Sequence, residues 1–214
     1  MRMRRTANIN EKLNKMSNYI VFEPEGIKGK WHELFGNENP IHLELGMGKG
    51  SFISVMSKRY PDINYLGLER VEDIIYKAAC REEIQESPNV KLLLADVENL
   101  PFYFNQMEIE RIYLNFSDPW PKNRHEKRRI THPRFLDIYK KLLKKGGEIF
   151  LKTDNEDFFD FSLLSIVETG YSLRKITYDL HKTNFAENVM TEYEQKFAAV
   201  GKPICRCEAI TPLD

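Results

Sequence analysis

Short apolar runs alternate with amphipathic stretches along most of this 214-residue chain, and this alternation constrains its fold more than any other feature. Each run has the length of a buried strand and is bounded by Gly, Asp, Asn or Pro. The five clearest predicted strands are His42–Leu45, Tyr65–Leu68, Val90–Leu94, Arg111–Asn115 and Glu148–Leu151. Strands that alternate with helices predict an α/β fold: a doubly wound, mostly parallel sheet with right-handed crossovers and helices on both faces.

The stretches between the strands have the periodicity of helices. Apolar residues recur at i, i+3 and i+4 in segments 51–59, 71–79 and 135–143, and less cleanly in 158–164. Ser51 is the expected N-cap of the first of these helices, and Gly146-Gly147 is the expected stop of the third. Two closing strands are expected at Tyr171–Tyr178 and Phe197–Val200.

Composition indicates a single soluble domain. The chain has 32 basic and 32 acidic side chains and is 42% hydrophobic, which suffices for one core. No apolar run approaches the roughly 18 to 20 residues that span a bilayer, and residues 1–12 lack the apolar core of a secretory signal. We therefore expect a cytoplasmic protein without a membrane partner. Residues 1–38 are predicted to be a basic, helical extension, with Arg2, Arg4 and Arg5, before a domain at 39–214.

The three cysteines, Cys80, Cys205 and Cys207, are too few for a disulfide framework and fit a reducing compartment. Cys205 and Cys207 form a C-x-C pair that could be half of a metal site. No second Cys/His cluster accompanies the pair, and alternate positions on a terminal strand share one face. We therefore expect a strand there and no metal.

The first predicted strand leads into a glycine-rich turn, Glu44-Leu45-Gly46-Met47-Gly48-Lys49-Gly50. In open α/β sheets, ligands bind beyond the carboxyl ends of the strands, where such a turn lets a ligand approach the backbone closely. The spacing is G-x-G-x-G, whereas a dinucleotide fingerprint is G-x-G-x-x-G. An acid at position 44 would repel a pyrophosphate but favour a cofactor that carries an amino group and a sulfonium.

Acids also follow the next two predicted strands. Glu69 stands where a carboxylate typically accepts hydrogen bonds from ribose hydroxyls, and Asp96 where a carboxylate can reach an adenine amino group. Each could instead be an ordinary exposed acid or a helix cap. Acids at the ends of three successive strands together favour an adenosine with a cationic tail.

The fourth predicted strand leads into a loop that two prolines make rigid, Ser117-Asp118-Pro119-Trp120-Pro121. We expect this loop to hold Asp118 near the reactive end of the cofactor. Trp120 could stack on a base or pack beneath the loop. The residues that follow are mostly cationic. Such a run could be an ordinary solvated surface, but beside this loop it can neutralise phosphates, which favours a nucleic-acid substrate.

These segments resemble the bacterial tRNA (guanine-N7-)-methyltransferase family. The motifs are ELGMGKG, GLE, LLADVENL, NFSDPWPKNRHEKRR, KTDN and Thr191-Glu192-Tyr193-Glu194, in the family's order and over nearly the whole chain. DPWPK before a basic stretch is highly specific, whereas the glycine turn is common to class I methyltransferases. The resemblance implies a seven-stranded, Rossmann-like sheet, S-adenosylmethionine as methyl donor, and a guanine in the tRNA variable loop as acceptor.

The resemblance also implies roles for individual residues. Cofactor contacts would come from Glu44, Gly46, Gly48, Gly50, Glu69, Asp96 and Asp118, with Asp118 also catalytic. Substrate contacts would come from Lys122, Asp154, Thr191, Glu192, Tyr193 and Glu194. RNA contacts would come from Arg124, His125, Glu126, Lys127, Arg128 and Arg129.

The residue types suit this chemistry. Guanine N7 has an in-plane lone pair and no proton, so it needs positioning and charge stabilisation rather than a general base. Asp118 can stabilise the positive charge that migrates to the purine. Asp154 and Glu194 can accept from the guanine N1–H and N2–H₂ edge, which adenine lacks. Asp154 could equally be a helix N-cap before Glu156.

Rival classes remain open at this stage. A nicotinamide-dependent dehydrogenase is disfavoured by the glycine spacing with Glu44, and a small-molecule methyltransferase by the basic segment after Lys122. A methyltransferase acting on another RNA, or a non-catalytic RNA-binding module, is compatible with the spacing alone. The sequence does not indicate whether the protein is a monomer or a homodimer.

Overall fold

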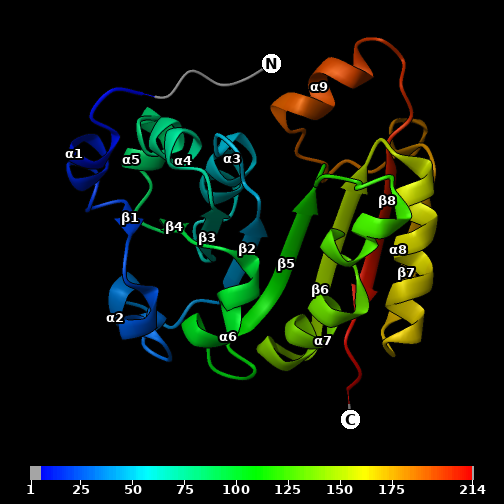
Figure 1. The fold of residues 1–214 in the computed structure, drawn as a ribbon, viewed down its shortest axis with the longest axis horizontal. Coiled ribbons are helices and arrows are strands. Elements are labelled where there is room, and N and C mark those ends of the chain that lie inside the picture. Colours follow the sequence, from blue (N-terminus) through cyan, green and yellow to red (C-terminus); the bar gives the residue numbers. More distant parts are fainter. Residues whose placement is uncertain (1–5, 214) are drawn as a thin grey trace. The chain divides into compact units, whose positions relative to one another are not determined.

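The computed structural model describes residues 6–213, so Arg2, Arg4 and Arg5 lie outside the described residues. The chain divides between Tyr103 and Phe104 into two compact units, the N-terminal unit and the C-terminal unit. Each contains four of the strands drawn in Figure 1. Within residues 6–213, none of the helices combines the length and the apolar character needed to cross a membrane.

The N-terminal unit has a parallel sheet in the order β1-β4-β3-β2. Its strands are β1 (Ile20–Val21), β2 (Ile41–Leu45), β3 (Asn64–Glu69) and β4 (Val90–Leu94). Every residue of β2 and β3 is buried, and the buried set includes the polar side chains of His42, Glu44 and Asn64. Because the strands are parallel, the carboxyl ends of β2, β3 and β4 lie at one edge of the sheet.

The helices of this unit are α1 (Ile9–Asn14), η1 (Pro24–Ile27), α2 (Trp31–Phe35), α3 (Ser51–Arg59), α4 (Glu72–Ala79), α5 (Glu82–Gln85), η2 (Val97–Asn99) and α6 (Leu100–Tyr103). The predicted helices 51–59 and 71–79 are confirmed as α3 and α4. Ser51 was wrongly expected to be the N-cap, because Gly50, with φ +74°, occupies the cap and Ser51 is already helical.

Residues 6–38 do more than extend the chain. β1 adds a parallel strand beside β4, and the indole of Trp31 is fully buried and donates a hydrogen bond to the Tyr103 carbonyl at 3.0 Å. Two helices and a 3₁₀ turn flank this strand in the sequence, so the segment is not simply helical. The short β1 also accounts for the eighth strand, one more than the seven expected.

The C-terminal unit has a mixed sheet in the order β5-β6-β8-β7. Its strands are β5 (Ile109–Asn115), β6 (Leu143–Thr153), β7 (Ser172–Thr177) and β8 (Cys205–Ile210). β5 and β6 are parallel, whereas β8 runs antiparallel to both β6 and β7. Its helices are η3 (Asn123–Arg128), α7 (Pro133–Leu142), α8 (Glu156–Glu168), η4 (Leu180–Lys182) and α9 (Glu192–Ala198).

Two boundaries in this unit were predicted wrongly. Helix α7 ends at Leu142, because Leu143 takes extended dihedrals and pairs with Ile109, so the expected stop at Gly146-Gly147 lies inside strand β6. Phe197–Val200 is not a strand but covers the end of α9 and the turn after it. A four-residue apolar run fits a helix as well as a strand, and the cap at Thr191 decides for the helix.

Candidate active site

The glycine turn after β2 has the backbone that only glycine adopts readily. Gly46, Gly48 and Gly50 have φ of +71°, +59° and +74°. The amides of Gly46 and Met47 both donate to the Leu68 carbonyl, at 2.9 and 3.1 Å, which fixes the turn beside the end of β3. A Cβ built at Gly46 or Gly48 would meet no protein atom within 4 Å. The turn therefore has open space beside its backbone, as a ligand-binding turn requires.

Glu69, the last residue of β3, is a buried carboxylate that already accepts hydrogen bonds from the backbone. Its Oε1 accepts hydrogen bonds from the amides of Arg70 at 2.9 Å and Val71 at 3.0 Å. Burial nevertheless raises the pKa of Glu69 above its ordinary value of 4.5, outweighing the backbone hydrogen bonds that lower it. A ligand that donates hydroxyl groups to this carboxylate would offset the cost of keeping it charged.

The other two strand-end acids differ in their surroundings. Glu44 is buried within β2. Asp96 follows β4, is half-buried, and caps η2 by accepting from the Glu98 amide at 3.0 Å. The capping role considered for Asp96 is thus present, and a ligand contact by the same side chain remains a prediction.

The residues of the N-terminal unit fit an adenosine-type cofactor. Three acids stand at or beside the carboxyl ends of three adjacent parallel strands, and the open glycine turn belongs to the same edge. Ribose hydroxyls and an adenine amino group are donors that carboxylates accept, and a cationic tail is attracted by the negative charge. Glu44, Glu69 and Asp96, with Gly46 and Gly48, could therefore hold S-adenosylmethionine.

In the C-terminal unit, the loop after β5 is strained and held in place. Phe116 and Trp120 have positive φ, +53° and +43°, which non-glycine residues adopt only at a cost. The Phe116 amide donates to the Lys152 carbonyl at 2.8 Å. At the other end, Arg129 donates to the carbonyls of Pro119 at 3.2 Å and Trp120 at 3.3 Å. Asp118 lies between these anchors with its side chain exposed.

Trp120 is half-buried against the basic segment that follows it. Its ring meets the His125 ring edge-on at 5.5 Å, and the Arg128 guanidinium lies 5.0 Å from its centroid. Of the two roles considered for Trp120, packing within its own loop is therefore observed. Stacking on a base stays a prediction.

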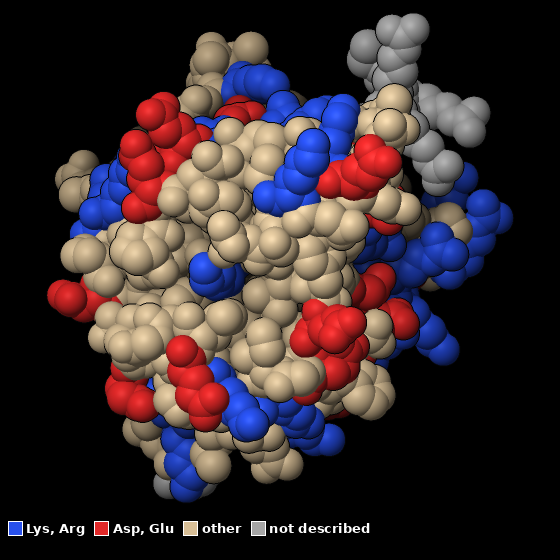
Figure 2. All heavy atoms as spheres, turned by 90° about the vertical axis from the view of Figure 1, so that its left-hand side faces the viewer, with Lys and Arg blue, Asp and Glu red and all other residues tan. Residues whose placement is uncertain are grey.

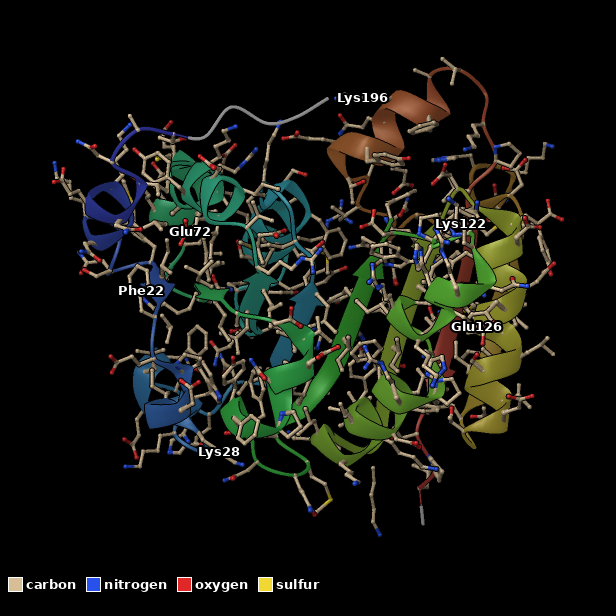
Figure 3. The ribbon with its side chains drawn as sticks, viewed as in Figure 1. Phe22, Lys28, Glu72, Lys122, Glu126 and Lys196 are labelled. Carbon is tan, nitrogen blue, oxygen red and sulfur yellow. The ribbon has the colours of Figure 1, made fainter. Side chains whose placement is uncertain are left out.

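The basic segment coincides with η3, and its side chains differ in direction. Arg124, Lys127 and Arg128 are exposed, whereas Arg129 is largely buried and stacks on the Phe161 ring at 4.3 Å. Figure 3 labels Lys122 and Glu126 on this segment. The face shown in Figure 2 carries Lys and Arg together with Asp and Glu.

Thr191–Glu194 forms the start of α9. Thr191 is the N-cap and accepts from the Glu194 amide at 3.0 Å. Tyr193 is 44% exposed, and its ring lies 5.0 Å from the Phe116 ring. Glu194 is fully buried and forms an ion pair with Lys152 at 2.6 Å. This segment is therefore in contact with the loop that carries Asp118.

Asp154 does not cap a helix. The N-cap of α8 is Asn155, whose side chain accepts from the Phe158 amide at 2.7 Å. Asp154 instead forms an ion pair with Lys202, whose ammonium also lies 4.7 Å from the Phe197 ring. The structure therefore excludes the helix-cap role that was considered for Asp154.

Two site residues were missed because no local pattern marks them. Lys152 belongs to the KTDN motif, but the sequence predicts no role for it or for Lys202. Lys152 meets Glu194 across 42 residues of sequence, and Lys202 meets Asp154 across 48. Both contacts join the end of β6 to the chain that precedes β8, which returns beside β6 by antiparallel pairing.

The C-x-C pair lies on a buried strand. Cys205 and Cys207 are buried on β8, as expected for alternate positions of a strand. Burial raises the pKa of Cys205 to about 11 and that of Cys207 to about 12, so both thiols are protonated at neutral pH. Within residues 6–213, no group of three or more His, Cys, Asp or Glu side chains is arranged to hold a metal ion.

A strand-end acid set, an open glycine turn and alternating α/β elements define a Rossmann-like class I methyltransferase. Residues 38–207 match a family model described as "Putative methyltransferase". Among solved structures, the 16S rRNA methyltransferase KamB matches with a TM-score of 0.64 at 13% identity, covering 86% of this chain and 94% of that chain. An antibiotic-related methyltransferase matches with a TM-score of 0.62 at 16% identity, covering 86% and 93%. These distant likenesses support the fold alone.

Closer relatives identify the family. The chain is 48% identical over 212 residues to the tRNA (guanine-N(7)-)-methyltransferase of Geobacillus thermodenitrificans (strain NG80-2), covering 99% of this chain and 98% of that protein. It is 49% identical over 209 residues to the enzyme of that name from Streptococcus thermophilus (strain CNRZ 1066), covering 98% of each. The chain belongs to the tRNA (guanine-N(7)-)-methyltransferase family.

Proposed function

We propose that this protein transfers a methyl group from S-adenosylmethionine to N7 of a guanine in the variable loop of tRNA. The observation that carries this proposal is the strained, doubly anchored loop that presents Asp118 and leads directly into exposed cations. The relatives that match over nearly the full chain are tRNA (guanine-N(7)-)-methyltransferases by name, which supports the same activity.

The N-terminal unit binds the methyl donor in this proposal. S-adenosylmethionine supplies a methyl group on a sulfonium, which is reactive toward a nitrogen lone pair. Glu69 accepts from the ribose hydroxyls, and Asp96 accepts from the adenine amino group. Glu44 attracts the cationic end, and the turn containing Gly46, Gly48 and Gly50 leaves space beside the backbone.

Asp118 acts by charge and position rather than as a base. Guanine N7 has no proton to lose, so the residue has nothing to abstract. The purine becomes cationic as it accepts the methyl group, and a fixed carboxylate stabilises that charge. The anchors at Phe116 and Arg129 hold Asp118 so that little reorganisation is needed.

Guanine selection is assigned to the segment around α9 and to Asp154. Asp154 accepts from the N1–H and N2–H₂ edge, and exchange of its Lys202 partner for the base is part of the proposal. Glu194 is fully buried against Lys152, so in this proposal it supports Thr191 and Tyr193 and does not contact the base. Glu192 and Lys122 remain proposed substrate contacts.

The exposed cations of η3 bind the RNA. Arg124, Lys127 and Arg128 are assigned to tRNA phosphates, because phosphate contacts supply affinity without reading sequence. His125 and Glu126 remain proposed RNA contacts, whereas Arg129 holds the Asp118 loop. We propose a cytoplasmic enzyme whose residues 39–214 form the methyltransferase domain and residues 1–38 an extension that adds strand β1 to the sheet.

Incubation with methyl-tritiated S-adenosylmethionine and bulk tRNA, followed by mapping of the labelled base, tests the proposal. We expect label in 7-methylguanosine within the variable loop. Label in another RNA or in a small molecule would indicate a different methyltransferase. Binding of tRNA with no transfer to any acceptor would indicate an RNA-binding module.

A further inference from the structure

Lys152 lies on β6 with its ammonium group almost completely enclosed. Its side chain is only 6% exposed. Nζ donates to Glu194 Oε2 at 2.6 Å, to the Val189 carbonyl at 2.9 Å and to Asn188 Oδ1 at 3.2 Å. Three partners match the three donors of an ammonium group. All three belong to the segment 188–194, which leads into and begins α9.

Glu194 is held from several sides. Its Oε1 accepts from Asn188 Nδ2 at 2.7 Å, and His181 Nε2 lies 3.5 Å from the same oxygen. Its amide donates to Thr191 Oγ1. A fully buried ion pair costs desolvation energy and is often no more stabilising than an apolar pair of similar size. The pair therefore needs an explanation other than stability.

The main chain of Lys152 holds a second segment of the proposed site. Its carbonyl accepts from the Phe116 amide, two residues before Asp118. The Lys152 ammonium lies 6.0 Å from the Phe116 ring, and that ring packs against Tyr193, the neighbour of Glu194. Lys152 is thus bonded both to the loop that carries Asp118 and to the segment 188–194.

We propose that Lys152 is a positioning residue whose ammonium group fixes Thr191–Glu194 against Phe116, so that the guanine contacts and Asp118 keep one spacing. The inference rests on the proposed function, because it concerns how the same site is ordered. Lys152 acts through Glu194 and does not itself touch the base.

Hydrogen exchange tests whether Lys152 fixes the segment 188–194, and it does not require any activity. In Lys152→Met we expect the amides of 189–194 to exchange at least tenfold faster than in the wild type. The matched control is Lys144→Met, which removes an exposed lysine of the same strand, paired with Glu110 at 3.9 Å. Unchanged exchange at 189–194 in Lys152→Met would overturn the proposal, whether or not the protein methylates tRNA.

Single-turnover methylation tests whether Lys152 positions the site. The rate is divided by the number of S-adenosylmethionine-binding sites, so that unfolded protein does not count. In Lys152→Met we expect a rate at least 30-fold below that of the wild type at saturating tRNA. We expect the affinity for S-adenosylmethionine to stay within about threefold of the wild type, because the glycine turn and the strand-end acids belong to the N-terminal unit. A merely structural lysine would lower the number of binding sites but leave the rate per site unchanged, which would refute the inference.

A double-mutant cycle tests whether Lys152 acts through Glu194. Lys152→Met/Glu194→Gln removes both charges, so it remains informative if Lys152→Met alone fails to fold. We expect its rate per site to stay at least 30-fold below wild type and within about threefold of the slower single variant that folds. A wild-type rate in the folded double variant, or rate reductions that multiply, would contradict the proposed coupling.

Discussion

Glu69 illustrates at the residue scale how a binding residue can work against stability. In the folded protein, burial raises its pKa, so the folded state binds a proton more readily than the unfolded chain. The cost of the charged carboxylate is therefore fully present above the raised pKa, and it is lost as pH falls through that pKa to below 4.5. Its carboxylate is nevertheless the acceptor that we assign to the ribose.

Replacement of Glu69 by Gln should separate these two effects. Gln keeps an acceptor oxygen for the amides of Arg70 and Val71 but removes the buried charge. We expect the free energy of unfolding at pH 7 to be no lower than that of the wild type. The Kd for S-adenosylmethionine should rise severalfold, because a hydrogen bond to a charged acceptor is worth on the order of 1 kcal/mol more than one to a neutral acceptor. Calorimetry measures the affinity, and urea titration measures the free energy of unfolding. Unchanged affinity for S-adenosylmethionine in Glu69→Ala would contradict the assignment of Glu69 to the ribose.

Asp118 allows charge to be separated from shape. Asp118→Asn keeps an acceptor oxygen in the anchored loop but lacks the negative charge. Because preorganised charge is usually the largest contribution in such sites, we expect Asn to be nearly as damaging as Ala, with the rate reduced on the order of 100-fold or more. Single-turnover methylation with both substrates saturating provides the measurement. Near wild-type turnover in Asp118→Ala would exclude a catalytic role.

At the scale of the elements, the basic segment should divide into two functions. Arg124 and Arg128 are exposed on η3, whereas Arg129 is bonded to the loop carbonyls and stacked on Phe161. We plot the logarithm of the tRNA-binding constant against the logarithm of the salt concentration. Replacing Arg124 and Arg128 by Ala should reduce the steepness of this line by about one for each phosphate that the protein no longer neutralises. Arg129→Ala should instead slow methylation with little change in slope. Titrations of tRNA at several salt concentrations decide this, and an unchanged slope in the double variant would make the segment an ordinary solvated surface.

The elements predicted correctly are those whose cause is local. β2 to β5 are apolar runs closed by turn residues, and α3 and α4 have clear helical periodicity. β6 begins in Leu-Lys-Lys-Gly-Gly, which has no strand pattern. Its first residue, Leu143, is extended where it pairs with Ile109 of β5. The end of α9 was missed because its apolar run outweighed a capping pattern that was visible in the sequence.

The same distinction holds for the candidate site. The glycines and acids of the N-terminal unit lie next to predicted strand ends, so the sequence alone indicated them. The pairs of Lys152 with Glu194 and of Lys202 with Asp154 depend on strands from distant parts of the chain. No spacing rule reaches across such distances, and the burial of Glu194 in particular had no signal in the sequence.

For the whole molecule, ligand-linked stability can test both the cofactor and the domain organisation. S-adenosylmethionine at about 100 times its Kd should stabilise the folded protein by roughly 2.7 kcal/mol. For a protein of this size each kcal/mol raises the Tm by about 2–4 °C, so we expect a shift of about 5–10 °C.

If residues 1–214 unfold as one domain, the shift should appear in a single cooperative transition. Glu69→Ala, with a roughly tenfold weaker Kd, should show about half of the shift at the same cofactor concentration, and this variant is the control for specific binding. Differential scanning calorimetry resolves the alternatives. Two transitions, of which only one moves with the cofactor, would show that the N-terminal and C-terminal units unfold independently and would contradict the single-domain proposal. A Tm that S-adenosylmethionine leaves unchanged would contradict the proposed cofactor.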